Sequence, residues 1–420
     1  MSVGVIMTLV QFGAGNIGRS FIGQLFAQAG YEVCFVDVDA ELIAELNITG
    51  SYVVEVRDTD PQEIHVQGVR GLHTSARERI VDEIAQASII GTAVGPRALP
   101  KVYPTIAEGL VKRHERNGGP IDIILCENLR DAAEHARQGL KESLPDGFPL
   151  EDTVGFVETS IGKMVPLITE EDRRRDPLRV YAEAYNTLIC DRRGFKTGVP
   201  AVPGLDPKDN MAAYVDRKLF IHNLGHAACA YIGHLQSPKA VHMWQIMRDE
   251  DIVEAGRRAM WESGRALCKA YPGEFTQQSI GDHIEDLLRR FANVALGDTI
   301  FRVGRDLRRK LSAEDRLIGA LRLEQRYGGA RYGTEFAVAC ALRFDAVDER
   351  GSAFEEDAQL LRQVAAQGPL ATLCEVSGLD LLDRDGAELL QGCMDAIAWL
   401  GRVLRECRKV VPDYFEMKGV

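Results

Sequence analysis

The sequence of 420 residues lacks an excess of positive charge, a long apolar run and a paired cysteine motif. Its formal net charge is −12, which argues against a general nucleic-acid binder, because such proteins present a basic surface. No run of about 18 apolar residues occurs, so we predict no membrane span. The apolar start MSVGVIMTLVQF has no basic segment before it, and we interpret it as a first strand rather than a signal peptide.

The cysteine pattern excludes a zinc finger and a thioredoxin-like redox motif. None of the nine cysteines forms a CxxC pair or lies at ligand spacing from histidine. Scattered thiols in a chain of this length are typical of a reduced, cytoplasmic protein in which cysteine serves as a small core residue. We therefore expect a cytoplasmic location and no bound metal. A P-loop is also excluded, since no GxxxxGK followed by Ser or Thr occurs.

The first half of the chain alternates strand and helix patterns. An amphipathic stretch at Arg19–Ala29 follows the first strand pattern and predicts a helix. Strands separated by helices imply parallel crossovers, so we predict an α/β, Rossmann-type domain with a doubly wound parallel sheet. The short apolar runs that predict its strands are Thr8–Phe12, Glu32–Val36, Ala87–Ala93, Ile121–Cys126 and Val154–Val157.

The pattern changes at Val199–Asp209, where three prolines disfavour a helix or a central strand. We interpret this segment as a linker between an NAD-binding domain over residues 1–203 and a substrate domain over residues 204–420. The second domain carries apolar residues at steps of three and four over most of its length and is predicted to be mostly α-helical. In the first domain, the charged run Arg173–Arg175 is expected to lie in an exposed loop.

A glycine-rich motif lies between the first strand, which ends at Phe12, and the helix after it. Its first glycine permits a tight turn, its second lets the backbone approach a pyrophosphate, and its third lets the helix pack closely. The helix N-terminus would offer free N–H groups to the phosphates. The motif, which matches GxGxxG, is Gly13-Ala14-Gly15-Asn16-Ile17-Gly18.

Asp37 ends the second predicted strand, about 20 residues after the last glycine, where an acidic side chain accepts hydrogen bonds from the ribose hydroxyls. Its carboxylate would repel a 2′-phosphate, so we expect NAD rather than NADP. We prefer Asp37 to Asp39 as the ribose ligand, and the structural alternative is a loop cap. A further strand is followed by Thr92, Ala93 and Val94, whose small side chains suit either a backbone that passes under the cofactor or an ordinary turn.

The segment DRKLFIHNLGH of the second domain carries candidate catalytic side chains. At about 100° per helical residue, His226 lies about 80° and Asn223 about 140° from Lys218, so the three can converge on one cleft. Alcohol oxidation needs a base and hydrogen-bond donors, which a lysine of lowered pKa, an amide and an imidazole can supply. Spacing does not separate His222 from His226. Taken alone, the spacing of Lys218, Asn223 and His226 is more typical of a solvated lysine, a capping asparagine and a core histidine.

Together, the motifs resemble those of the mannitol dehydrogenase family of polyol-specific long-chain dehydrogenases, over nearly the whole chain. They include FGAGNIGRSFIG, TAVGP, CENL and RVGRDLRRKLSAEDRLI, and the family signature K-x4-N-x2-H falls on Lys218, Asn223 and His226. The resemblance implies metal-independent oxidation, by NAD, of one secondary hydroxyl of a polyol or polyol phosphate. It implies that Lys218 is the general base, that Asn223 and His226 orient the reactive oxygen, and that Asn128 lies near nicotinamide and substrate.

The resemblance is incomplete at one place. The family commonly has an Asp-Arg pair before Ile-x-Pro, whereas this chain has Gly162 and Lys163 there. The aromatic-rich pattern before the linker is altered as well, to YNTL at residues 185–188. If the missing Asp contacts substrate hydroxyls, the exact polyol differs while the reaction class is retained.

The stretch RVGRDLRRK is densely basic in an otherwise acidic chain. It is either a clamp for a phosphate or carboxylate, or a solvated helix face. The family places substrate-binding basic residues in this region, so the resemblance favours Arg302 and Lys310.

Three other functions remain open at this point. One is a dehydrogenase of a hexuronate-derived acid such as tagaturonate or fructuronate, whose carboxylate the basic stretch would hold. Another is a dehydrogenase of a non-phosphorylated polyol. The third is a sensor that binds NAD without turnover, against which the complete Lys-Asn-His set argues.

Overall fold

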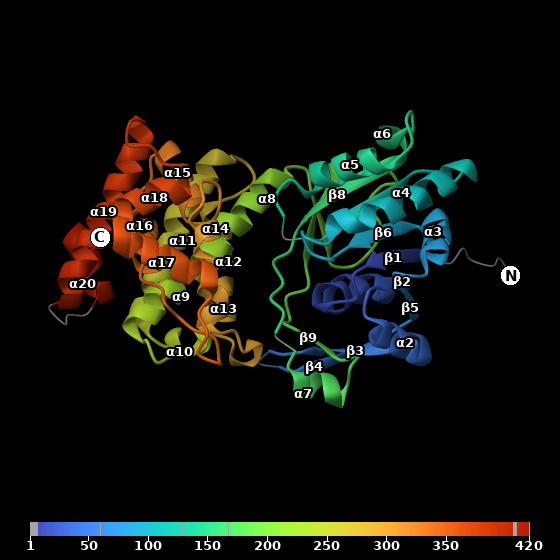
Figure 1. Cartoon of the computed structure of the whole chain (residues 1–420), viewed down its shortest axis with the longest axis horizontal. Helices are drawn as coiled ribbons and strands as arrows, with labels where there is room; N and C mark the ends of the chain where they lie inside the picture. The colour runs from blue at the N-terminus through green and yellow to red at the C-terminus, as the bar shows by residue number, and fades with distance from the viewer. Residues whose placement is uncertain (1–6, 59, 128, 167, 406–409, 420) are drawn as a thin grey trace. The chain divides into compact units, whose positions relative to one another are not determined.

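The computed structural model describes residues 7–58, 60–127, 129–166, 168–405 and 410–419. The chain divides into two compact units, Met1–Val215 and Asp216–Val420, and each is described by itself (Figure 1). The first contains a mostly parallel sheet with helices on both faces, and the second is helical. Both fold predictions are thereby confirmed. Asn128, one of the predicted ligands, lies outside the described residues.

The described part of the first unit contains an eight-stranded sheet of order β11-β10-β8-β7-β6-β1-β2-β5. Its neighbouring strands are parallel except for the β8–β10 pair. Strand β1 lies between β2 and β6, so the strand order reverses there, and open α/β sheets bind ligands at such a reversal. The strands are β1 (Thr8–Phe12), β2 (Glu32–Asp37), β5 (Val69–His73), β6 (Ile89–Thr92), β7 (Ile121–Leu125), β8 (Val154–Ser160), β10 (Leu188–Asp191) and β11 (Leu205–Lys208).

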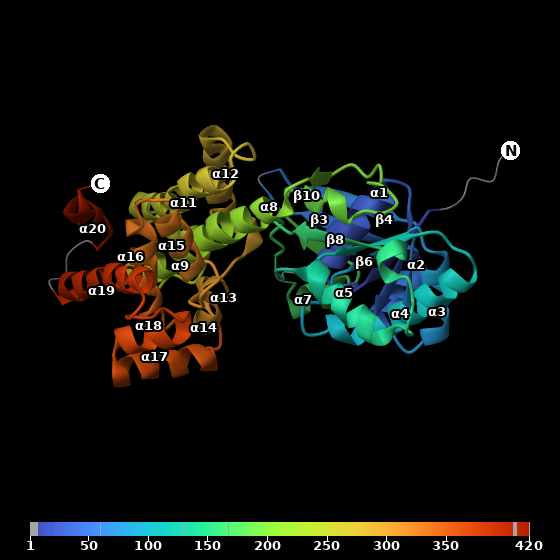
Figure 2. The same ribbon diagram turned by 90° about the horizontal axis from the view of Figure 1, so that it is seen from above.

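Side chains of β1 alternate between two cores, as the two-residue repeat of a strand requires. Leu9 packs in the core formed with η1 and α1, whereas Val10 and Phe12 pack in the core formed with α3, α4 and α5. Figure 2 shows the latter three helices side by side over the sheet. The helices of this unit are η1 (Gly18–Gly23), α1 (Gln24–Gln28), α2 (Ala40–Thr49), α3 (Arg77–Gln86), α4 (Leu99–Glu115), α5 (Ala132–Ser143), α6 (Leu150–Thr153), α7 (Glu170–Arg175) and η2 (Arg192–Gly194).

Local details of the first unit differ from the expectations. The loop expected at Arg173–Arg175 is wrong: these residues end the exposed helix α7, which a capping box of Thr169 and Asp172 begins. Leu205–Lys208, within the expected linker, forms β11 and pairs with β10. A small second sheet has the order β4-β3-β9, with β3 (Ser51–Val56), β4 (Gln62–Gln67) and β9 (Val180–Ala182).

In the second unit, three helices with few exposed residues pack on one another: α9 (Leu224–Gln236), α11 (Glu250–Ala270) and α16 (Tyr332–Ala341). A Cβ on Gly333 would lie 2.7 Å from the backbone nitrogen of Ala259, so glycine allows α16 to approach α11. No helix in the described ranges is long and apolar enough to cross a membrane.

The helices that follow the strands of the first unit form one series along the chain. They are α8 (Met211–Arg217), η3 (Lys218–Asn223), α9 (Leu224–Gln236), α10 (Met243–Ile246), α11 (Glu250–Ala270), α12 (Gln277–Phe291), η4 (Val294–Leu296), α13 (Ile300–Gly304), α14 (Leu307–Lys310), α15 (Ile318–Arg326), α16 (Tyr332–Ala341), α17 (Glu355–Gln367), α18 (Pro369–Ser377), α19 (Arg384–Arg405) and α20 (Val410–Lys418).

Candidate functional site

The glycine loop after β1 has a backbone that only glycine permits at two positions. Gly13 has a φ of +92°, and a Cβ there would lie 2.4 Å from the carbonyl oxygen of Ala93. A Cβ on Gly18 would lie 1.9 Å from the carbonyl oxygen of Gly13. Gly15 is exposed, and no atom lies within 4 Å of its Cβ position. The loop is therefore closed on the protein side and open at Gly15, as a backbone that approaches a phosphate needs to be.

A buried arginine holds this loop from the helix that follows it. Arg19 donates from Nε to the carbonyl oxygen of Ala14 at 2.7 Å and from Nη1 to that of Leu178 at 2.7 Å. Burial lowers the pKa of Arg19 to about 10, so the guanidinium remains charged at neutral pH. The helical run of Asn16 and Ile17, η1 and α1 includes a π-helical turn, and Tyr52 donates to the carbonyl oxygen of Arg19 within that turn at 2.7 Å.

The two acidic candidates at the end of β2 have different partners. Asp37 is half-buried; its Oδ2 accepts a hydrogen bond from the Ala14 N–H at 2.6 Å and its Oδ1 from the Asp39 N–H at 3.0 Å. Asp39 caps α2 by accepting from the Leu42 N–H at 3.1 Å. The carboxylate of Asp37 thus adjoins the glycine loop, while that of Asp39 serves a helix end.

The segment after β6 is tied to a buried carboxylate. Thr92 donates from Oγ1 to Glu127 Oε2 at 2.8 Å, and the Val94 N–H donates to Glu127 Oε1 at 3.1 Å. The Ala93 N–H donates to the carbonyl oxygen of Phe12 at 2.8 Å. Burial raises the pKa of Glu127. Sequence reasoning missed this residue, although it precedes Asn128 in CENL; only the motif itself marked it.

The candidate catalytic residues lie on one continuous helical run formed by α8, η3 and α9. Lys218 and Asn223 are the first and last residues of η3, a π-helical turn. A π-helix bonds residue i to residue i+5, so it brings these two residues nearer to one line along the helix than α-helical spacing would. The angle of about 140° expected between them assumed an α-helix, and that assumption is wrong for this segment.

Lys218 is half-buried at the start of the π-helical turn. Burial, together with the nearby charge of Arg316, lowers the pKa of Lys218 to about 8. A lysine with such a pKa has an appreciable neutral fraction near pH 8, and the neutral amine is the form that can accept a proton.

The two histidines of the run differ in their neighbours. The ring of His226 stacks on Phe291 with a centroid separation of 4.4 Å and an interplanar angle of 7°. Its Nε2 lies 3.6 Å from Asp298 Oδ2, and neither atom has a hydrogen-bond partner in the described part of the chain. Burial lowers the pKa of His226 to about 4 and that of His222 well below 6.5. Both rings are therefore neutral at neutral pH, and Asn223 lies half-buried between them in sequence.

The predicted clamp residues lie on α13 and α14. Arg302 donates from Nε to Asp298 Oδ1 at 2.6 Å, and its Nη2 pairs with the same oxygen. Lys310 is 3% exposed and donates from Nζ to the carbonyl oxygen of Val303. Burial lowers the pKa of Lys310 well below 10.5. Asp298 was not singled out from the sequence, although its four-residue spacing from Arg302 is the usual signal for a helical ion pair.

The rest of the basic stretch forms other contacts. Arg308 pairs with Glu375 and donates to Gln363, and Arg309 pairs with Asp306 and Asp315, all on the surface or near it. The solvated-face interpretation thus describes these two arginines, whereas Lys310 is buried.

The two departures from the family pattern adjoin one another in the first unit. A Cβ on Gly162 would lie 3.5 Å from Cε1 of Tyr185, and Lys163 donates from Nζ to Asn186 Oδ1 at 2.7 Å. The ammonium of Lys163 lies 4.9 Å from the ring centroid of Phe21. The substitutions at 162–163 and 185–188 therefore form one connected change rather than two.

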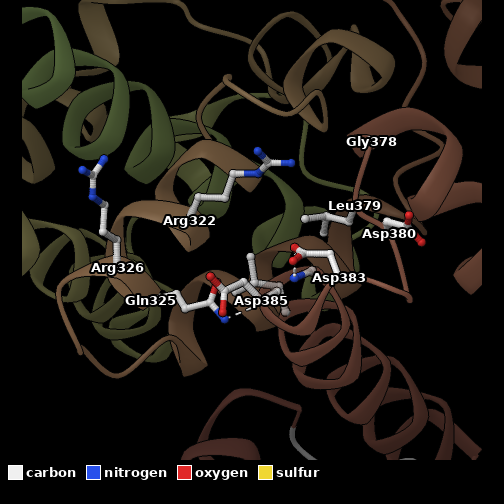
Figure 3. A pocket seen from close by; sticks show the side chains of 10 residues that line it. Arg322, Gln325, Arg326, Gly378, Leu379, Asp380, Asp383 and Asp385 are labelled. Atoms are coloured by element: carbon white, nitrogen blue, oxygen red, sulfur yellow. Dashed lines mark hydrogen bonds between the residues drawn. The ribbon is translucent and has the colours of Figure 1, made fainter.

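A cavity of about 660 Å³ in the second unit is separate from these residues. Figure 3 shows Gln325 at one edge, bonded to the backbone of Asp385 at 3.1 Å. None of the predicted catalytic residues lines this cavity. In the described ranges, no group of three or more His, Cys, Asp or Glu side chains is arranged to hold a metal.

Two protein-family models match the chain: the mannitol dehydrogenase Rossmann domain over residues 7–204 and the mannitol dehydrogenase C-terminal domain over residues 210–375. Among solved structures, a substrate-free D-sorbitol dehydrogenase is 16% identical with a TM-score of 0.77, covering 96% of both chains. The mannitol 2-dehydrogenase of Pseudomonas fluorescens, in a ternary complex with NAD and D-mannitol, is 16% identical with a TM-score of 0.69, covering 93% of this chain and 95% of the other. At this identity the two structures show a common fold.

Proposed function

Because the chain belongs to the mannitol dehydrogenase family, we propose that it is an NAD-dependent dehydrogenase that interconverts mannitol 1-phosphate and fructose 6-phosphate. Membership places it among oxidoreductases that act on a CH–OH group. The phosphorylated substrate is proposed because motifs such as FGAGNIGRSFIG and RVGRDLRRKLSAEDRLI are similar to those of mannitol-1-phosphate 5-dehydrogenases. The observation that carries the proposal is the lowered pKa of Lys218 on a helical run with Asn223 and His226.

In the proposed mechanism, the neutral amine of Lys218 accepts the proton of the substrate hydroxyl. The amide of Asn223 donates a hydrogen bond to the oxygen as negative charge develops on it. The neutral imidazole of His226, with Asp298 beside Nε2, orients the same hydroxyl. When bound, NAD supplies the acceptor for the hydride that leaves the carbon.

The first unit fits NAD. The exposed side of Gly15 leaves room for a pyrophosphate, and Asp37 carries a carboxylate at the end of β2 beside the glycine loop. A 2′-phosphate at that place would meet this negative charge, so NADP is disfavoured. Thr92, Ala93 and Val94, tied to Glu127 and Phe12, are the further proposed cofactor contacts.

The test is a screen of NAD reduction with mannitol 1-phosphate, glucitol 6-phosphate, mannitol and the uronate-derived acids. We expect mannitol 1-phosphate to have the highest kcat/KM, with activity that survives exhaustive chelation of metals. A free polyol is the second candidate, because the connected change at Gly162, Lys163 and Tyr185 alters a region where the family commonly has an Asp-Arg pair. A preference for the free polyol or a sugar acid would overturn the phosphate assignment and keep the reaction class.

A further inference from the structure

Arg316 lies between α14 and α15 and is held by one carboxylate. Its backbone N–H and its Nε both donate to Asp315 Oδ1, at 2.6 and 2.7 Å. The other oxygen, Asp315 Oδ2, accepts from Arg309 Nη1 at 3.0 Å. The side chain of Arg316 is only 11% exposed. Asp315 therefore fixes the direction of a nearly buried guanidinium through its Nε.

The opposite edge of this guanidinium, which carries Nη1 and Nη2, makes no hydrogen bond within the part of the chain that the structure describes. Neither atom is among the buried polar atoms that lack a partner, so the edge reaches solvent. Two parallel N–H donors on one planar edge match the geometry of a phosphate or carboxylate group. The edge is thus presented as a bidentate donor.

Arg316 lies in the neighbourhood of the candidate catalytic residues. Gly319, at the start of α15, packs on Phe220 of η3, because a Cβ on Gly319 would lie 2.8 Å from Cε1 of Phe220. Phe220 is two residues from Lys218. The charge of Arg316 is also close enough to contribute to the lowered pKa of Lys218, His226 and Lys310.

The basic groups of this region differ in how closely an acidic partner holds them. Arg302 pairs with Asp298, and Arg309 pairs with Asp306 as well as with Asp315. Lys310 donates to a carbonyl oxygen, and Asp306 and Asp357 lie near enough to raise its pKa against the larger effect of burial. Arg316 shares its one carboxylate, Asp315, with Arg309. An anionic group on the substrate would complete the charge balance of Arg316, whereas a hydroxyl of a free polyol would not.

We propose that Arg316, together with Lys310, binds the phosphoryl group of the substrate through its Nη1 and Nη2 edge. This assignment rests on the proposed function as a polyol-phosphate dehydrogenase. It gives Arg302 a different task from the one the sequence favoured: Arg302 holds Asp298, whose other oxygen faces His226, and is a positioning residue.

The first experiment compares KM for mannitol 1-phosphate and for mannitol in the unmodified enzyme, Arg316→Gln and Arg316→Lys. Loss of a charge-assisted bond is worth about 1.5–3 kcal/mol, so we expect KM for the phosphate to rise about 10- to 150-fold in Arg316→Gln, with KM for mannitol nearly unchanged. Arg316→Lys should recover part of the loss. Arg309→Gln, which removes the other arginine on Asp315, is the matched control and should change neither KM substantially. Equal rises for both substrates in Arg316→Gln would overturn the assignment.

The second experiment separates this assignment from the proposed function. Titration calorimetry with inorganic phosphate should show binding to the unmodified protein and at least about tenfold weaker binding to Arg316→Gln, which corresponds to about 1.4 kcal/mol. If no polyol phosphate is oxidised but phosphate binding depends on Arg316, the anion site stands and the proposed substrate is wrong. If a sugar acid is the substrate and its KM depends on Arg316, the site binds a carboxylate instead and the phosphoryl assignment is wrong. Phosphate binding that is equal in both proteins would refute the site itself.

Discussion

The candidate site of the first unit is formed by the backbone, whereas that of the second unit is formed by side chains. In the first unit, the glycine loop after β1 is shaped by backbone geometry, with Gly13 at φ +92° and Gly18 against the Gly13 carbonyl. In the second unit, the candidate site consists of basic side chains, Lys218, Arg316 and Lys310, and burial lowers the pKa of Lys218 and of Lys310. A backbone site depends on which residues can adopt a conformation, whereas a side-chain site depends on what the fold places around them.

Both units nevertheless use the same local device. A π-helical turn follows the glycine loop at Gly18–Gly23, and another begins at Lys218. Such turns are rare in proteins as a whole, but those that occur often lie at functional sites. In the first, glycine at both ends permits close packing, since a Cβ on Gly23 would lie 2.5 Å from Phe35. In the second, the ends are Lys218 and Asn223, so the turn aligns the two side chains proposed to be catalytic instead of two small ones.

The largest effect on turnover is expected from removing the amine of Lys218, in the second unit. Lys218→Ala should lower kcat for polyol oxidation about 10²- to 10⁴-fold, because proton abstraction by a positioned base contributes that much. The affinity for NAD, measured by fluorescence titration, should stay nearly unchanged, since the glycine loop belongs to the other unit. Lys239→Ala, at an exposed position, is the control and should be as active as the unmodified enzyme.

The pH profile gives Lys218 a second, independent readout. Deprotonation activates a base, so the oxidation rate should rise with pH through the lowered pKa of Lys218, about 8. That limb should be missing in Lys218→Ala and retained in Asn223→Ala, because an amide does not titrate. If Lys218→Ala kept both its turnover and this limb, the base would have to be sought at His226 or His222.

The preference for NAD over NADP tests the candidate site of the first unit. Asp37→Asn should reduce the preference for NAD over NADP by about tenfold or more, equivalent to about 1.4 kcal/mol. The amide oxygen can still accept from the Ala14 N–H, so the loop is kept while the charge is removed. Asp39→Asn, which alters the cap of α2, should leave the preference unchanged. Equal affinities for NAD and NADP in the unmodified protein would exclude Asp37 from this role.

The contrast between the units also explains what the sequence could predict. The strand at Thr8–Phe12 was predicted with its exact bounds, because a short apolar run followed by GxGxxG leaves little freedom. Strands β3, β4, β5, β9, β10 and β11 were missed. β3 and β4 pair antiparallel beside the main sheet, and β4 is mostly exposed, so neither forms the apolar run that marked the central strands.

Within the second unit, the sequence predicted residue types better than arrangement. The family signature assigned the catalytic roles to Lys218, Asn223 and His226, and these roles stay a prediction. The π-helical turn changes how the three residues are aligned, and no local sequence pattern predicted that turn. Asp298 and Arg316 were not identified, because their importance comes from what tertiary packing places beside them: His226 for one, and the helix that carries Lys218 for the other. Ion-pair spacing alone would have ranked them with the exposed pairs of the surface.

A smaller effect is expected where one buried side chain positions another. Asp298→Asn should lower kcat several-fold by removing the carboxylate beside His226 Nε2. A double-mutant cycle with His226→Gln should give a coupling energy of about 0.5–3 kcal/mol, as for residues in contact. Arg302→Gln, which removes the other partner of Asp298, tests whether Arg302 acts through the same pair. Additive effects of Asp298→Asn and His226→Gln on kcat would show that Asp298 does not position His226.

The smallest effect on turnover is expected at Glu324, a buried titratable group outside the candidate site, so its substitution separates the effect of burial from that of catalysis. Glu324 is fully buried; its Oε1 accepts from Ser263 at 2.5 Å and Thr334 at 2.9 Å, and its Oε2 has no partner in the described ranges. Burial and the neighbouring Glu262 raise the pKa of Glu324 well above 4.5. A raised carboxyl pKa means that the folded state holds the proton more tightly, so its contribution to stability is present below about pH 4.5 and is lost as pH rises towards the folded pKa. Each unit by which the pKa is raised corresponds to about 1.4 kcal/mol.

Glu324→Gln cannot ionise, so this variant should become more stable relative to the unmodified protein as pH rises from 4.5. Urea unfolding at several pH values measures this difference, and kcat should stay the same. The exposed Glu356→Gln should show no such trend, and a pH-independent difference for Glu324→Gln would mean that this carboxyl group does not titrate differently in the folded and unfolded states.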